Sequence, residues 1–132
     1  MEDVRAAISV AVSKADYTIV SAYHSATNSP RENLFPQVLL ACALARKDEL
    51  GFFSAADVRD PMSSIMEKTY DIPAFSRHLN DFCEEKRGPV LQKMGVKKRF
   101  RYRFINPMVE PYVTMKGLAT GLITEDVLND SF

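Results

Sequence analysis

The sequence carries no net charge, contains no long apolar run and has only two cysteines. No stretch approaches the roughly 18 consecutive apolar residues that a transmembrane helix needs, so no membrane span is expected. The N-terminus, MEDVRAAISV, has none of the basic and apolar layout of a cleavable signal. Cys42 and Cys83 both fall in apolar helical patterns, which predicts buried free thiols in a reducing compartment. We therefore expect a cytoplasmic protein.

Signatures of catalysis and of metal binding are also missing. The chain has neither a G-x-x-x-x-G-K-[ST] phosphate loop nor an apolar run ending in paired acids that could hold magnesium. His24 and His78 are the only histidines, and His78 with Cys83 falls short of a structural zinc ligand set. We expect no enzyme activity from this chain alone, no metal site and no cofactor.

The apolar pattern that is present predicts mainly helices. Apolar residues at steps of three and four predict one long helix over residues 2–26 and an almost wholly apolar one over 34–46. Ser54, with Asp57 three residues later, predicts a helix capped at residue 54 and continuing to about residue 66, bent or restarted at Pro61. A further helix is predicted with Pro73 in its first turn and Gly88 at its end. Its buried stripe comprises Phe75, Leu79 and Phe82.

A short hairpin and one more helix complete the expected fold. Strands are predicted at 90–93 and 99–105, joined by a turn at Gly95. Strand alternation sends Phe100, Tyr102 and Phe104 to one face and Arg99, Arg101 and Arg103 to the other. The last helix should cover 108–123, where Gly117 and Gly121 allow another helix to approach closely, and the acidic tail 124–132 should be frayed.

Helices followed by a two-stranded hairpin are the arrangement of a winged helix-turn-helix. The expected fold is therefore mainly α with a small β-hairpin, in three parts. A long N-terminal helix resembling a lid or linker occupies residues 1–28, a winged-helix domain with its C-terminal helix occupies 29–123, and the acidic tail occupies 124–132.

Basic residues are concentrated in one segment, although 17 basic and 17 acidic residues cancel overall. The segment 86–103 contains no acid and eight basic residues, namely Lys86, Arg87, Lys93, Lys97, Lys98, Arg99, Arg101 and Arg103. Such a local excess matters more for binding a polyanion than the overall sum does. On the hairpin, Lys97, Lys98, Arg99 and Arg101 are candidate phosphate contacts. The alternative is that these residues only keep an exposed edge strand from aggregating.

The run from LLACALARKDELGFF through IPAFSRHLNDF to VKKRFRYRFINPMVEPYVTMKGL resembles the C-terminal winged-helix region of bacterial AAA-type ATPases. These ATPases are similar in layout to the archaeal origin-recognition initiators. The resemblance implies a non-catalytic module of an ATPase that it anchors on double-stranded DNA, with any ATP binding confined to another domain. It also implies DNA contacts from the helix after the turn and from the wing, at Ser76, Arg77, Asn80, Lys97, Lys98 and Arg99.

Two functions remain open. In the first, the wing holds phosphates, and the helix either reads bases, with Arg77 on guanine and Asn80 on adenine, or, as we favour, makes only weak backbone contacts. In the second, the module makes protein contacts, either with an ATPase domain or with a second copy, and binds no DNA. Asp81, Glu84 and Glu85 on the polar side of the candidate reader helix favour the second interpretation, since they would repel phosphates.

Overall fold

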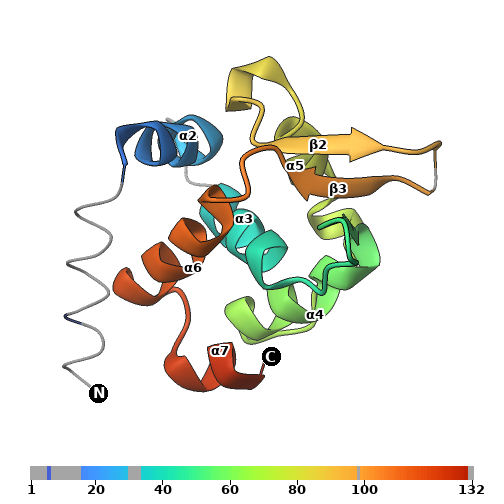
Figure 1. Cartoon of the computed structure of the whole chain (residues 1–132). Helices are drawn as coiled ribbons and strands as arrows, with labels where there is room; N and C mark the ends of the chain where they lie inside the picture. Colours follow the sequence, from blue (N-terminus) through green and yellow to red (C-terminus); the bar gives the residue numbers. More distant parts are fainter. Residues whose placement is uncertain (1–5, 7–15, 30–33, 98, 131–132) are drawn as a thin grey trace.

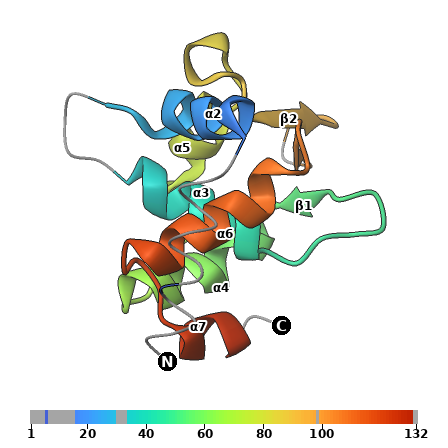
Figure 2. The same ribbon diagram turned by 60° about the vertical axis from the view of Figure 1, so that its left-hand side comes forward.

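The computed structural model describes residue 6 and residues 16–29, 34–97 and 99–130 (Figures 1 and 2). It is mainly helical, with a small three-stranded antiparallel sheet. The α-helices are α2 (Tyr17–Thr27), α3 (Phe35–Leu44), α4 (Ala55–Met66), α5 (Ser76–Asp81), α6 (Val109–Ala119) and α7 (Glu125–Asp130). The 3₁₀ turns are η1 (Ile72–Ala74) and η2 (Glu85–Arg87), and the strands are β1 (Phe53–Ser54), β2 (Leu91–Met94) and β3 (Arg101–Phe104).

Helix α3 is the centre of the core, as its apolar sequence predicts. Eight of its ten residues are buried, and α2, α4, α5 and α6 all pack against it. Helix α6 comes especially close at Gly117, where a Cβ atom would lie 2.8 Å from both terminal methyl groups of Leu40. The small residue expected at a helix contact is therefore confirmed at Gly117. Gly121 has a different role, because it follows the end of α6 with a φ of +80° and helps to terminate the helix.

Helix α4 begins and ends where the sequence predicts. The Ser54 hydroxyl accepts from the Asp57 backbone N–H at 3.2 Å, and the Asp57 carboxylate accepts from the Ser54 N–H at 2.9 Å. This reciprocal pair satisfies two backbone donors that the first turn would otherwise leave unpaired. Pro61 lies inside the helix, which runs unbroken from Ala55 to Met66.

The single helix predicted over residues 2–26 is not continuous. Helix α2 starts at Tyr17, because Asp16 has a non-helical backbone and its carboxylate accepts from the Thr18 N–H at 2.8 Å. Most of the preceding part of that prediction, residues 2–5 and 7–15, lies outside the described residues.

The helix predicted between Asp71 and Gly88 is divided into η1, α5 and η2. Its stripe of Phe75, Leu79 and Phe82 is fully buried as expected. The helical pattern nevertheless stops at Phe82, whose carbonyl accepts from the N–H groups of Val90 and Leu91 at 3.0 and 3.2 Å. The Phe82 carbonyl thus accepts from the residues at the start of β2, whereas in a longer helix it would accept from the N–H four residues later.

The prediction of a frayed tail is also wrong over the described part of it. Residues Glu125–Asp130 form α7. Val127 and Leu128 on this helix are partly buried and pack against the core. Burial of these apolar side chains stabilises a segment whose acidic composition alone suggests disorder.

The sheet has the strand order β1-β3-β2, and β1 was not expected from the sequence. Phe53 pairs with Tyr102 across β1 and β3, while Leu91 pairs with Phe104 across β2 and β3. Tyr102 and Phe104 are buried and Arg101 is exposed, which confirms the predicted alternation of aromatic and basic residues. The aromatic face covers the helices and the basic residues of β3 face away.

Candidate nucleic-acid interface

The β2–β3 hairpin extends beyond the helical body (Figure 1). Its turn depends on Gly95, which has a φ of +104° and where a Cβ atom would lie 2.8 Å from the Arg99 carbonyl oxygen. The Arg99 N–H closes the turn on the Val96 carbonyl at 2.8 Å. Lys97 and Arg99 are exposed at this tip, and neither forms an ion pair with a described residue.

Lys93 joins the hairpin to helix α5. Its ammonium Nζ lies 4.5 Å from the centre of the Phe100 ring and donates to the Asn80 Oδ1 atom at 3.4 Å. The ring and the amide lie on different elements, so both help to fix the position of the charge. Lys93 was not among the predicted contact residues, and the structure places it between the predicted helix and the predicted wing.

Helix α5 is anchored by its buried side and leaves two predicted residues exposed. Phe75 and Leu79 are fully buried, whereas Arg77 and Asn80 are exposed and lie three positions apart, on neighbouring turns. Ser76 is half-buried. Arg77 forms no ion pair with a described residue, so its guanidinium is available to an anionic ligand. We define the candidate interface as Arg77, Asn80, Lys93, Lys97 and Arg99.

Arg101 and Arg103 point to the other side of the sheet. Arg101 Nη1 lies 3.2 Å from Asp48 Oδ2, and Arg103 stacks on the Phe52 ring at 4.5 Å while donating to Gln92 Oε1 at 2.9 Å. Both guanidinium groups therefore have local partners. The structure does not bring Arg101 together with the candidate interface, although Arg101 was predicted to contact phosphates.

Two further basic residues have partners within the fold. Arg87 stacks on the Phe35 ring at 3.8 Å and donates to the carbonyls of Ala26 and Asn28, which holds the end of α2. Lys86 lies 3.4 Å from Glu84 and 3.9 Å from Asp81. Hence only part of the basic segment is left to attract a polyanion. Lys98, the remaining predicted contact, lies outside the described residues.

Burial shifts the pKa of two side chains close to the interface. Desolvation lowers the pKa of His78 on α5, and the Asp81 carboxylate opposes this shift. The imidazole is therefore neutral at physiological pH and adds no positive charge beside Arg77. Desolvation raises the pKa of the half-buried Cys83 thiol to about 11, so this thiol remains protonated and unreactive near neutral pH.

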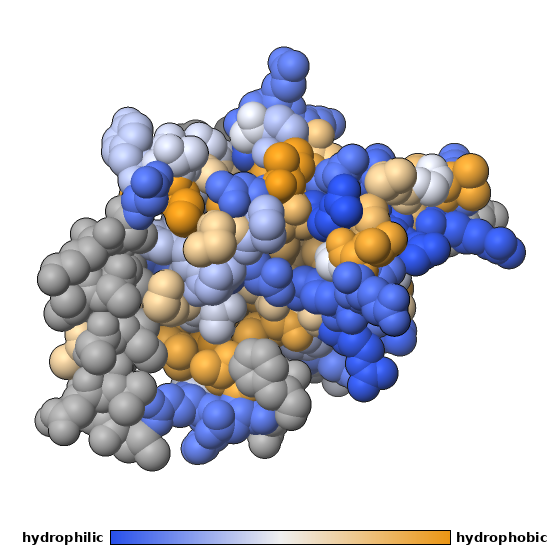
Figure 3. Space-filling view, viewed as in Figure 1, coloured by the Kyte–Doolittle hydropathy of each residue, from blue (hydrophilic) through white to orange (hydrophobic). Residues whose placement is uncertain are grey.

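The outer sheet face carries exposed apolar residues as well as arginines. We define it as Leu50, Met94, Arg101, Arg103 and Ile105. Met94 is paired with Arg101 in the sheet, and the Leu50 carbonyl accepts from Arg103 at 3.5 Å. Leu50, Met94 and Ile105 are 71%, 49% and 51% exposed. Figure 3 shows apolar residues interrupting the hydrophilic surface around the hairpin.

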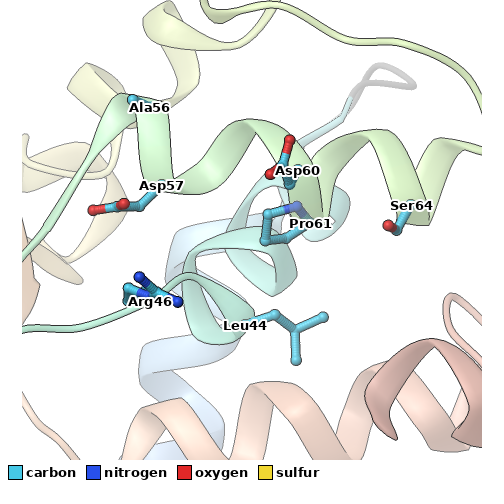
Figure 4. Close-up of a pocket in the computed structure, with 7 residues that line it drawn as sticks. All are labelled: Leu44, Arg46, Ala56, Asp57, Asp60, Pro61 and Ser64. Atoms are coloured by element: carbon cyan, nitrogen blue, oxygen red, sulfur yellow. The ribbon is translucent and has the colours of Figure 1, made fainter. Parts of the chain in front are cut away.

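A separate pocket of about 470 Å³ lies between the end of α3 and helix α4 (Figure 4). Its lining residues are Leu44, Arg46, Ala56, Asp57, Asp60, Pro61 and Ser64. The Asp57 carboxylate is already engaged by two donors of Ser54, at 2.9 and 3.0 Å. The pocket shares no lining residue with the candidate interface and offers no histidine or cysteine for nucleophilic catalysis.

Within the described ranges, no three His, Cys, Asp or Glu side chains gather as metal ligands. None of the described helices has the length and hydropathy needed to cross a membrane.

Comparisons of the chain with protein-family models, curated proteins and solved structures give no match. The geometry of the hairpin and α5 is therefore the evidence that bears on function.

Proposed function

We propose that the chain is a winged-helix module that binds double-stranded DNA. The observation that carries the proposal is Lys93, whose side chain contacts both Asn80 on α5 and Phe100 on the hairpin. The Lys93 side chain thus joins the helix and the hairpin into one continuous surface. Winged-helix proteins bind DNA through these two elements. Arg77, Lys97 and Arg99 supply further positive charge to this surface.

The topology supports the winged-helix part of the proposal. The elements α3, β1, α4, α5, β2 and β3 follow one another as helix, strand, helix, helix, strand, strand, and the sheet order is β1-β3-β2. In this frame α5 is the reader helix and the β2–β3 hairpin is the wing. The resemblance to AAA-type ATPases extends the proposal to a non-catalytic module that anchors an ATPase domain on DNA.

Two arginines of the same hairpin provide a matched test. Arg99 lies at the tip without an ion-pair partner among the described residues, whereas Arg101 is paired with Asp48 on the outer sheet face. Each phosphate contact contributes a salt slope of about −0.9, equivalent to about eightfold in affinity at about 0.1 M salt. Fluorescence anisotropy with a labelled duplex should therefore show about eightfold weaker binding for Arg99→Gln and little change for Arg101→Gln. Equal effects of the two substitutions would contradict the proposed interface.

A second candidate function is protein contact, and the outer sheet face favours it. Exposed Leu50, Met94 and Ile105 lie beside two arginines, and methionine and arginine are enriched in protein interfaces. If this face joins two copies of the chain, Leu50→Ser should reduce self-association in sedimentation velocity and leave DNA affinity unchanged. Monomers at all concentrations for both the parent chain and Leu50→Ser would contradict self-association through this face.

A further inference from the structure

Lys93 favours one orientation of the Asn80 side-chain amide. The ammonium is positioned by the Phe100 ring at 4.5 Å, and it donates to Asn80 Oδ1 at 3.4 Å. A rotated amide would turn its NH₂ group toward the ammonium, so that two donors would face each other. Oδ1 therefore faces Lys93, and Nδ2, which has no hydrogen-bond partner among the described residues, is left to meet a ligand.

This orientation disfavours the paired hydrogen bonds with which asparagine recognises adenine. An asparagine reads adenine by donating from Nδ2 to N7 while Oδ1 accepts from the N6 amino group. At Asn80 the Oδ1 atom of that pair already accepts from the Lys93 ammonium, so the adenine amino group would have to approach the second lone pair beside a positive charge that repels its hydrogens. The other members of the candidate interface, Arg77, Lys97 and Arg99, carry only donors, which serve phosphate oxygens at the surface of the duplex and the O6 and N7 atoms of guanine only if the side chain reaches the floor of the major groove.

The length and charge of α5 also limit how deeply it can enter the major groove. The helix has six residues, about 9 Å at 1.5 Å per residue, and it ends at Asp81. Glu84 and Glu85 follow at once and are exposed. A deeper insertion would move these carboxylates toward the phosphates, so the favourable contact is shallow and uses the start of α5 together with the wing.

We infer that the interface binds duplex DNA through its phosphates and does not read base sequence. Asn80 and Lys93 form one positively charged unit that offers the Asn80 Nδ2 donor and the Lys93 ammonium to a phosphate. This inference rests on the proposed function and specifies its ligand as duplex DNA of any sequence. It selects backbone contact over base reading, the two modes of DNA binding that the sequence leaves open for Arg77 and Asn80.

The test is a competition experiment by fluorescence anisotropy with three unlabelled duplexes of equal length. One contains alternating A·T pairs, one alternating G·C pairs and one a mixed sequence. The proteins are the parent chain, Asn80→Ala, Asn80→Asp, Arg77→Lys and Lys93→Gln, with Lys116→Gln as a control that removes one positive charge from α6. Circular dichroism verifies that each variant is folded.

The parent chain should bind the three duplexes with Kd values within about threefold of one another, well below the discrimination that a base-reading contact gives. Asn80→Ala should preserve these ratios. Lys93→Gln should weaken binding to all three by about eightfold at about 0.1 M salt. Asn80→Asp should do the same, because its carboxylate would pair with the Lys93 ammonium, and Lys116→Gln should change nothing.

Two results would overturn the inference in distinguishable ways. A preference of about tenfold or more for one duplex would show sequence reading and leave the proposed DNA-binding function standing, and its loss in Asn80→Ala or Arg77→Lys would identify the reading residue. Absence of binding to every duplex would refute the proposed function itself, and the inference with it.

Discussion

Lys47 is expected to be the most important basic residue for stability. Its Nζ atom donates to the carbonyls of Cys42, Ala43 and Ala45 at 2.8, 2.9 and 2.7 Å, and it lies 2.9 Å from Glu110 Oε1. These carbonyls end helix α3, where the helix dipole also favours a positive charge. The side chain of Lys47 is only 16% exposed, so water replaces the ammonium poorly.

Lys47→Met keeps the aliphatic part of the side chain and removes the charge. The Cys42 carbonyl retains a second donor, the Ala45 N–H at 3.3 Å, whereas Ala43 and Ala45 lose their ammonium donor. Hydrogen bonds to a charged group contribute about 1.5–3 kcal/mol each, and partial hydration reduces the net loss. We expect the free energy of unfolding to fall by about 2–4 kcal/mol.

The measurement is urea denaturation followed by far-UV circular dichroism. Lys97→Met is the control, because Lys97 is exposed in the hairpin turn and its substitution should change stability by less than about 0.5 kcal/mol. Glu110→Gln should cost only about 1 kcal/mol, since its side chain is 34% exposed. If Lys47→Met were as stable as the control, or if Glu110→Gln cost as much as Lys47→Met, the helix-end argument would be refuted.

Three further predictions concern packing and titration. Gly117→Ala should destabilise the fold by about 1–3 kcal/mol in the same denaturation assay, because its methyl group would overlap the buried Leu40 side chain, and an unchanged midpoint would contradict this packing. Burial lowers the pKa of His78 in the folded state, so the unfolded chain binds more protons below pH 6.5 and stability should decline as the pH falls. His78→Gln should flatten that decline between about pH 6.5 and 5, and an identical pH profile would count against it. Cys83 should react slowly with a thiol reagent at about pH 8 until urea unfolds the chain, because burial raises its pKa to about 11; reaction at the unfolded rate in the native state would refute this.

Local features of the fold could be predicted from the sequence. The Ser54–Asp57 cap lies within one helical turn, and the alternation of Tyr102 and Phe104 with Arg101 follows from the two-residue period of a strand. The buried stripe of the segment 72–87 was also predictable. The interruption of that helix was not, because it depends on a carbonyl that bonds to the start of β2.

The candidate interface could be predicted only in part. Exposed Arg77, Lys97 and Arg99 follow from local pattern, but the partners of the other cations are distant in sequence. Lys93 meets Asn80 across 13 positions and Arg101 meets Asp48 across 53, so composition cannot distinguish the available charge from the paired one. The pairing of β1 with β3 brings Arg101 to the segment that holds Asp48, and β1 is too short to stand out in the sequence.

The most direct test of DNA binding is the salt dependence of affinity for a generic duplex. Four cations of the candidate interface, Arg77, Lys93, Lys97 and Arg99, should each contribute about −0.9 to the log–log slope, giving a slope of about −3.6. Fluorescence anisotropy across a salt series measures this slope directly. Steep binding of this kind in the micromolar range is the predicted result. No binding even at about 50 mM salt, or an affinity that does not change with salt, would contradict the account.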